Sequence, residues 1–159
     1  MAFTVFLDVD GVLNTRRTVK QTPKGYQGIV DSRVELLAQA IREYGGGDIV
    51  LSSDWKELHK DNDDYVYLEE KLAKFGLKIK DETKDKRHCE RGAGIHDYLE
   101  AHPEIEEFVI LDDCKWDFDE YPKLWERLLL TDGIENAAYA SRTPAVEAML
   151  FLDAIKKFA

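Results

Sequence analysis

Short apolar runs and helical repeats alternate along the chain. Four runs are apolar almost throughout and end in a polar residue: 3–8 (FTVFLD), 48–52 (DIVLS), 108–112 (FVILD) and 128–132 (LLLTD). Such runs predict strands that are buried on both faces of a sheet, because a strand with one wet face alternates apolar and polar positions. LKIK at 77–80 predicts an additional short strand.

Helices are predicted between these strands. The first should begin near Ser32, whose hydroxyl would cap it together with Glu35, and should end at the glycines 45–47. Further helices are expected at 64–75, 93–101 and 122–128, and a last helix from about Pro144 to Phe158 with Thr143 as its cap. The polar stretch 81–91 is expected to be a loop.

This alternation of strands and helices predicts the fold class. It favours a parallel sheet with helices on both faces, so we expect an α/β, three-layer, Rossmann-like fold. The length of 159 residues is typical of a single domain, here residues 1–159. In open sheets of this kind ligands bind beyond the carboxyl ends of the strands. The residues at those ends are therefore the candidates for a functional site.

Carboxylates and hydroxyls follow all four apolar runs. These residues are Asp8-Val9-Asp10-Gly11, Ser52-Ser53-Asp54, Asp112-Asp113 and Thr131-Asp132. One aspartate after a strand is often only a turn residue. Two strands that each end in an aspartate are not explained by turn formation alone. If their carboxylates meet, two like charges 4 Å apart repel by roughly 4 kcal/mol at an effective dielectric of 20. Mg²⁺ would remove that repulsion, and it usually leaves positions open for waters and a substrate phosphate. The pattern therefore predicts Mg²⁺ and a phosphorylated ligand.

The same segments resemble the motifs of the haloacid dehalogenase (HAD) superfamily. FLDVDGVLN (6–14) is similar to the first motif, IVLSS (49–53) to the second and VILDDCKWD (109–117) to the fourth. The third motif is a Lys or Arg upstream of the fourth, and Arg91 is its best candidate. Within the superfamily, LSSDWK and the segment that begins at Arg91 look most like small phosphatases associated with nucleic-acid end repair.

The resemblance implies a catalytic role for four side chains. Asp8 would be the nucleophile that forms an aspartyl-phosphate, and Asp10 the general acid and base. Ser52 would donate a hydrogen bond to the phosphoryl group, and Ser53 is the alternative or shares this role. Arg91 would offset negative charge, with Lys84, Lys86 and Arg87 as competitors for the position.

The resemblance also implies the Mg²⁺ ligands. These are Asp8, the backbone carbonyl of Asp10, Asp113 and, through a water or the third-motif cation, Asp112. Asp117 completes a DxxxD spacing, or else caps a helix. Gly11 would let the chain turn and bring backbone N–H groups near the phosphate.

The motif spacing leaves no room for a large cap domain. About 20 residues separate Asp10 from Ser32, and about 38 separate Ser53 from Arg91. The site should therefore be open, either to a macromolecular end or to closure by an oligomer partner. The stretch 15–30 carries Arg16, Arg17 and two lysines and no acid before Asp31, so it could bind further substrate phosphates, although a solvated basic loop is the commoner role. Tyr26 and Trp55 could stack on a base, although packing is the commoner role for each.

Composition narrows the function classes. The net charge of −10 argues against broad nucleic-acid binding, and no apolar run approaches the ~18 residues of a membrane span. The N-terminus has no basic region or cleavage site of a signal peptide, and Cys89 and Cys114 form no metal or CxxC spacing, so a cytoplasmic protein with reduced thiols is expected.

These observations favour a Mg²⁺-dependent phosphatase that hydrolyses phosphate monoesters. Its substrate would be a phosphorylated small molecule, such as a nucleotide, or a nucleic-acid end, and no oligomeric state is predicted. Two alternatives compete with this function. A signalling receiver domain also uses an aspartate, but there the acid pair comes first in the chain. A non-catalytic Mg²⁺-dependent binding module on the same fold is the second, because fold does not imply function.

Overall fold

The computed structural model describes residues 3–85 and 90–159, which form a six-stranded sheet in the order β3-β2-β1-β4-β5-β6. The strands are β1 (Thr4–Leu7), β2 (Asp48–Leu51), β3 (Ile79–Glu82), β4 (Phe108–Asp112), β5 (Leu128–Leu130) and β6 (Ala138–Tyr139). The first five pair in parallel, and β6 pairs antiparallel with β5. The predicted α/β fold is confirmed. The sequence pattern misses β6, because two exposed residues form no apolar run.

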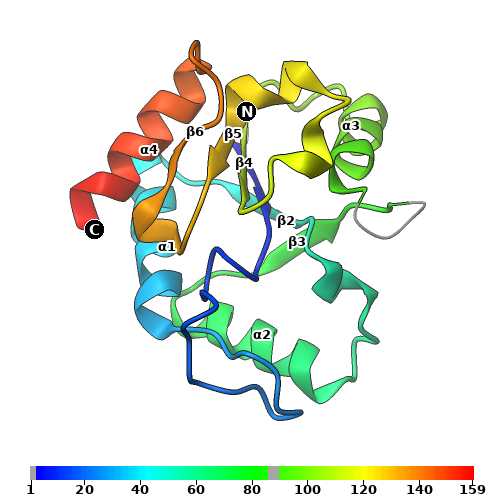
Figure 1. The fold of residues 1–159 in the computed structure, drawn as a ribbon, viewed down its shortest axis with the longest axis vertical. Coiled ribbons are helices and arrows are strands. Elements are labelled where there is room, and N and C mark those ends of the chain that lie inside the picture. The colour runs from blue at the N-terminus through cyan, green and yellow to red at the C-terminus, as the bar shows by residue number, and fades with distance from the viewer. Residues whose placement is uncertain (1–2, 86–89) are drawn as a thin grey trace.

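Helices cover both faces of the sheet (Figure 1). One face packs against α1 (Asp31–Tyr44), α2 (Asp63–Lys74) and α4 (Val146–Phe158). The other packs against α3 (Arg91–Ala101) and the 3-10 helices η2 (Trp116–Phe118) and η3 (Pro122–Arg127). Two more 3-10 helices are η1 (Asp54–Glu57) and η4 (Ile134–Asn136). Along β1, Val5 and Leu7 join the first core, and Phe6 between them joins the second. Burial of both strand faces explains why these strands are apolar throughout.

The strands at the centre of the sheet are aligned at their carboxyl ends. Leu7 of β1 pairs with Leu51 of β2 and Leu111 of β4. The next residues, Asp8, Ser52 and Asp112, therefore lie side by side. Each stands two positions after a side chain in the α3-facing core, so strand alternation directs it to that same face.

The first helix begins earlier than predicted. α1 starts at Asp31, its N-cap is Val30, and no side chain caps it, so the expected capping box of Ser32 and Glu35 is wrong. Tertiary contacts set this start instead. The Val30 N–H donates to the Leu13 carbonyl, and the Asp31 carboxylate binds Lys71 and Lys74 of α2.

Three other predicted elements differ from the structure. α4 starts at Val146 and not at Pro144, and its N-cap is Ala145 and not Thr143, because the Ala145 N–H is held by the Glu126 carbonyl. β3 is Ile79–Glu82 and not 77–80, since the Leu77 N–H still bonds to the end of α2, and β3 thus enters the expected loop 81–91. The expected helix 122–128 is the 3-10 helix η3.

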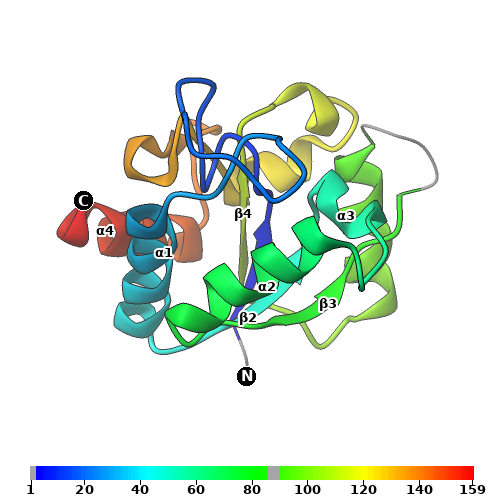
Figure 2. The ribbon, with the colours of Figure 1, turned by 90° about the horizontal axis from the view of Figure 1, so that it is seen from below.

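The site edge is covered by loops and not by an inserted domain. In the part of the chain that the structure describes, the β1–α1 segment contains no helix or strand of the sheet, and the β2–α3 segment contains η1, α2 and β3 alone. Figure 2 shows the β1–α1 segment arching over the carboxyl-terminal edge of the sheet. None of the described helices combines the length and apolarity needed to cross a bilayer.

Candidate active site

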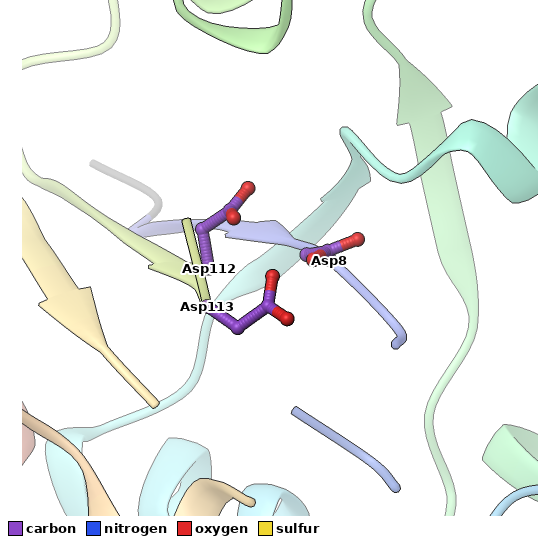
Figure 3. A group of neighbouring side chains, drawn as sticks. All are labelled: Asp8, Asp112 and Asp113. Carbon is purple, nitrogen blue, oxygen red and sulfur yellow. The ribbon is translucent and has the colours of Figure 1, made fainter. Parts of the chain in front are cut away.

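Three carboxylates meet at the carboxyl ends of β1 and β4 (Figure 3). Asp8, Asp112 and Asp113 each offer an oxygen, and these atoms all lie within 4.8 Å of one another. Asp8 is only 3% exposed and Asp112 is fully buried, whereas Asp113 is exposed. The group is therefore anchored in the core and open to solvent on one side.

The surroundings disfavour the ionised forms of Asp8 and Asp112. Burial, and next the charge of Asp112, raise the pKa of Asp8 well above its ordinary value, although Arg91 acts in the opposite direction. Burial likewise raises the pKa of Asp112 to about 7. An all-oxygen donor set with surplus negative charge suits a hard divalent cation such as Mg²⁺. The residues present therefore fit the metal that the sequence predicts.

Arg91 is the cation that the fold brings to this group. It is the first residue of α3 and is buried. Its Nε lies 2.8 Å from Asp112 Oδ2, and its Nη2 lies 2.8 Å from Asp117 Oδ2. Although burial opposes it, the charges of Asp112, Asp8 and Asp117 hold the pKa of Arg91 above its ordinary value. One guanidinium thus offsets part of the carboxylate charge, and the remainder favours a metal.

Only one of the competing cations lies among the described residues. Lys84 is exposed, and Lys86 and Arg87 lie outside the described residues, as does Cys89. Asp117 is not a helix cap, since it lies inside η2 and pairs with Arg91.

Two glycines let α3 approach its neighbours closely. A Cβ on Gly92 would lie 2.2 Å from the Asp117 carbonyl oxygen, and a Cβ on Gly94 would lie 1.7 Å from the Asp85 carboxylate.

The two adjacent serines have different surroundings. The Ser53 hydroxyl accepts a hydrogen bond from the Trp55 N–H and thereby caps η1. The Ser52 side chain is completely buried, and its hydroxyl has no hydrogen-bond partner among the residues that the structure describes. A buried hydroxyl without a partner costs about 1–3 kcal/mol. A ligand oxygen bound at Ser52 would remove that cost, so the geometry favours Ser52 over Ser53.

The Asp10 carboxylate lies apart from the group of three and is held by two side chains. The Trp55 indole Nε1 donates to Asp10 Oδ2 at 3.1 Å, and Asn14 Nδ2 donates to Asp10 Oδ1 at 2.9 Å. Asn14 Oδ1 also accepts from the Gly11 N–H. Sequence reasoning missed the roles of Asn14 and Trp55, although Asn14 stands within the first motif.

Gly11 is required by the tightness of the turn. Its φ is +86°, and a Cβ there would lie 2.3 Å from Asp113 Oδ2. Its carbonyl accepts from the Thr131 hydroxyl and the Gly133 N–H, which tie the turn to the end of β5. Any side chain would both strain the backbone and displace Asp113.

The two arginines of the β1–α1 segment lie away from the carboxylates. Arg17 is exposed and pairs with Asp132 at 3.5 Å, and Arg16 is also exposed, with its carbonyl accepting from Gln27. Within residues 3–85 and 90–159, no contact of either side chain with the three carboxylates is found. Their expected contact with substrate phosphates stays a prediction.

A second buried cation was not anticipated from the sequence. Lys56, in η1, is buried, and its Nζ donates to the Ser52 carbonyl, the Thr83 hydroxyl and Asp85 Oδ2 at 2.9, 3.2 and 2.9 Å. It therefore connects the end of β2 to the chain after β3. A lysine in a short 3-10 helix carries no periodic signal, because a single turn has no repeated face.

Comparison with known families gives one match. The family model for the HAD domain in Swiss Army Knife RNA repair proteins matches residues 4–136, which include the four motif segments. Neither a curated protein nor a solved structure matches the chain. The match covers the chain from β1 to η4, and with it all of the site residues described above.

Proposed function

Because the chain belongs to the family of HAD domains in Swiss Army Knife RNA repair proteins, we propose that it is a Mg²⁺-dependent phosphatase that removes monoester phosphate from nucleotides or nucleic-acid ends. One observation carries the chemical part of this proposal: the convergence of Asp8, Asp112 and Asp113 at the carboxyl edge of the sheet. The family description supports the substrate class. The phosphatase-type chemistry follows from the family as a whole.

In the first step Asp8 acts as the nucleophile. A carboxylate oxygen of Asp8 attacks phosphorus, the ester P–O bond breaks, and its electron pair passes to the leaving oxygen, which takes a proton from the Asp10 carboxyl. Bound Mg²⁺ would supply charge neutralisation between the nucleophile and the phosphate. The Ser52 hydroxyl donates to a phosphoryl oxygen, and Arg91 offsets negative charge around Asp112.

In the second step water releases the phosphate. Asp10, now a carboxylate, takes a proton from the water that attacks the aspartyl-phosphate, and inorganic phosphate leaves with Asp8 regenerated. The hydrogen bonds from Trp55 and Asn14 support this role, because they hold the Asp10 carboxylate in one orientation for both proton transfers.

The nucleophile is tested by Asp8→Asn. We expect Mg²⁺-dependent phosphate release from p-nitrophenyl phosphate and from 3′- and 5′-phosphorylated oligonucleotides to fall by roughly 10⁴-fold, the scale on which loss of a nucleophile acts. Asp153→Asn is the matched control, because it makes the same change at an exposed carboxylate of α4 that is not among the site residues and should leave turnover nearly unchanged.

Two outcomes would contradict the proposal. Turnover that survives in Asp8→Asn would refute the nucleophile, and a wild-type protein that binds Mg²⁺ but releases no phosphate would be a binding module. Turnover of small phosphates with none of the oligonucleotides would limit the substrate to small molecules.

A further inference from the structure

A pocket of about 420 Å³ opens beside Asp10, which is one of its lining residues. Its walls include Tyr26 from the β1–α1 segment and Trp55 and Leu58 from the chain around η1. Asp10 and Asp54 also line it. The volume falls in the range of small-ligand sites, about 300–1,000 Å³. Because it lies next to Asp10, the proposed acid and base, the pocket is a candidate site for part of the substrate.

The pocket lies where the leaving group must be. Asp10 exchanges a proton with the ester oxygen, so that oxygen lies within hydrogen-bond reach of its carboxylate. Whatever the ester oxygen is attached to must then continue past Asp10. Because Asp10 itself lines the pocket, the part of the substrate that remains after phosphate is removed would extend into that space.

Tyr26 is an exposed aromatic residue on a fixed backbone. The residue is 70% exposed, yet its N–H donates to the Thr22 hydroxyl and its carbonyl accepts from the Thr22 N–H. The Thr22 hydroxyl in turn donates to Asp64 of α2, which also accepts from the Lys24 N–H. Figure 1 shows this segment running beside α2. A ring presented on a tethered loop loses little backbone entropy when a ligand stacks on it.

The charges at the pocket select a neutral occupant. Its lining, within the described residues, contains Asp10, Asp54 and Asp64 but no lysine or arginine. A second phosphate would therefore be repelled there. An aromatic ring with hydrogen-bond donors, such as the base and hydroxyls of one nucleoside, suits aromatic walls with carboxylate acceptors.

We propose that this pocket binds the terminal nucleoside of the substrate, with its base against Tyr26 and the scissile phosphate at Asp8. This proposal rests on the proposed function and adds the recognition of the leaving group. Internucleotide phosphates of a longer substrate would lie outside the pocket.

The test compares phosphorylated substrates with and without a base. We would compare kcat/KM for adenosine 5′-monophosphate and ribose 5-phosphate, with adenosine 3′-monophosphate as the other phosphate position, in wild type, Tyr26→Ala and Tyr26→Phe. Base stacking on an aromatic side chain predicts a loss of about 5- to 100-fold for the nucleotides in Tyr26→Ala, little change for ribose 5-phosphate, and recovery in Tyr26→Phe. Val19→Ala is the control, because Val19 is exposed on the same segment and does not line the pocket.

The readouts separate failure of the pocket from failure of the proposed function. Equal loss on nucleotide and ribose phosphate, or no loss on either, would overturn the nucleoside pocket while leaving a phosphatase intact. If wild type releases no phosphate from any substrate, the proposed function has failed, and calorimetric titration with adenosine then decides the pocket. Binding that weakens in Tyr26→Ala and recovers in Tyr26→Phe supports it, and absence of adenosine binding refutes it.

Discussion

The Asp10 side chain depends on two neighbours for its orientation. Its exposed carboxylate would otherwise sample several rotamers, and the hydrogen bonds from Trp55 Nε1 and Asn14 Nδ2 restrict it. A proton-transfer group contributes about 10²- to 10⁴-fold to rate when it is correctly placed. Trp55 is therefore expected to act on the rate through Asp10, without itself touching the reacting atoms.

Removing the indole donor tests this positioning. In Trp55→Phe we expect kcat/KM for glycerol 2-phosphate, which reports formation of the aspartyl-phosphate and not its hydrolysis, to fall by about tenfold, part of what general acid catalysis supplies. The kcat/KM for p-nitrophenyl phosphate should fall much less, because p-nitrophenolate leaves without needing a proton. Steady-state kinetics on both substrates make the measurement.

The control for that variant is Trp116→Phe, since Trp116 is 83% exposed and has no hydrogen bond to Asp10. An equal fall on both substrates in Trp55→Phe would mean a general structural effect and would exclude the positioning role.

At the level of elements, a buried ion pair connects η1 to the chain that follows β3. Lys56 of η1 binds Asp85, just after β3, and both side chains are almost inaccessible, at 6% and 3% exposure. Burial raises the pKa of Asp85, against the effect of Lys56. Breaking a buried pair from one side is costly because it leaves an uncompensated charge.

Lys56→Met is therefore expected to lower the free energy of unfolding by about 3–5 kcal/mol at neutral pH. Urea denaturation followed by circular dichroism gives this value. The double variant Lys56→Met/Asp85→Leu should recover much of the loss, because it removes both charges together.

An exposed ion pair between neighbouring parts of the chain serves as the control. Lys60 binds Glu82 of β3 on the surface, and Lys60→Met should cost less than about 1 kcal/mol. Equal costs for Lys56→Met and Lys60→Met, or a double variant no better than Lys56→Met, would show that the buried pair is not what fixes η1.

At the scale of the whole molecule, the carboxylate group couples stability to pH and metal. Unfolded aspartates have a pKa of about 3.9, whereas the pKa values of Asp8 and Asp112 are raised in the fold, that of Asp112 to about 7. Between those values the folded state binds more protons than the unfolded state. The stability that these two groups contribute is therefore complete below about pH 4 and is lost as pH rises to about 7.

In metal-free buffer the urea midpoint should accordingly fall across that interval, and it should fall less in Asp8→Asn. Titration of Asp31 does not change the urea midpoint in this interval. The hydrogen bond from Lys71, followed by that from Lys74, lowers its pKa to about 2, so its contribution disappears only at lower pH. A midpoint that rises from about pH 4 to 7 would contradict the raised pKa values.

Added Mg²⁺ should reverse the loss near neutral pH. A ligand at 100 times its Kd stabilises by about 2.7 kcal/mol, and the gain should be largest where the carboxylates are ionised. Asp113→Asn should lose most of this gain, because it removes a carboxylate from the group of three. A wild-type melting temperature unaffected by Mg²⁺ would rule out the metal site.

Much of the fold and of the candidate site can be predicted from the sequence because their signals are local. The apolar runs that became β1, β2, β4 and β5 lie where the pattern indicates, and Asp8 and Asp112 stand at the ends of β1 and β4. The motif order identifies the family, which the match over residues 4–136 confirms. These features depend on neighbours in the chain, so periodicity and spacing reveal them.

The remaining features depend on contacts between residues far apart in the chain. The burial of the Ser52 hydroxyl without a partner, the enclosure of Arg91 by Asp112 and Asp117, and the start of α1 at Asp31 all follow from how the sheet aligns distant segments. The burial of Lys56 could not be predicted from the sequence for the same reason, because it depends on an ion pair with Asp85 in a separate segment of the chain. The amino-acid sequence by itself determined the strands, the acids at their ends and the family. The tertiary structure decided which of those side chains meet, because only packing brings a helix start, a 3-10 turn and two strand ends to one place.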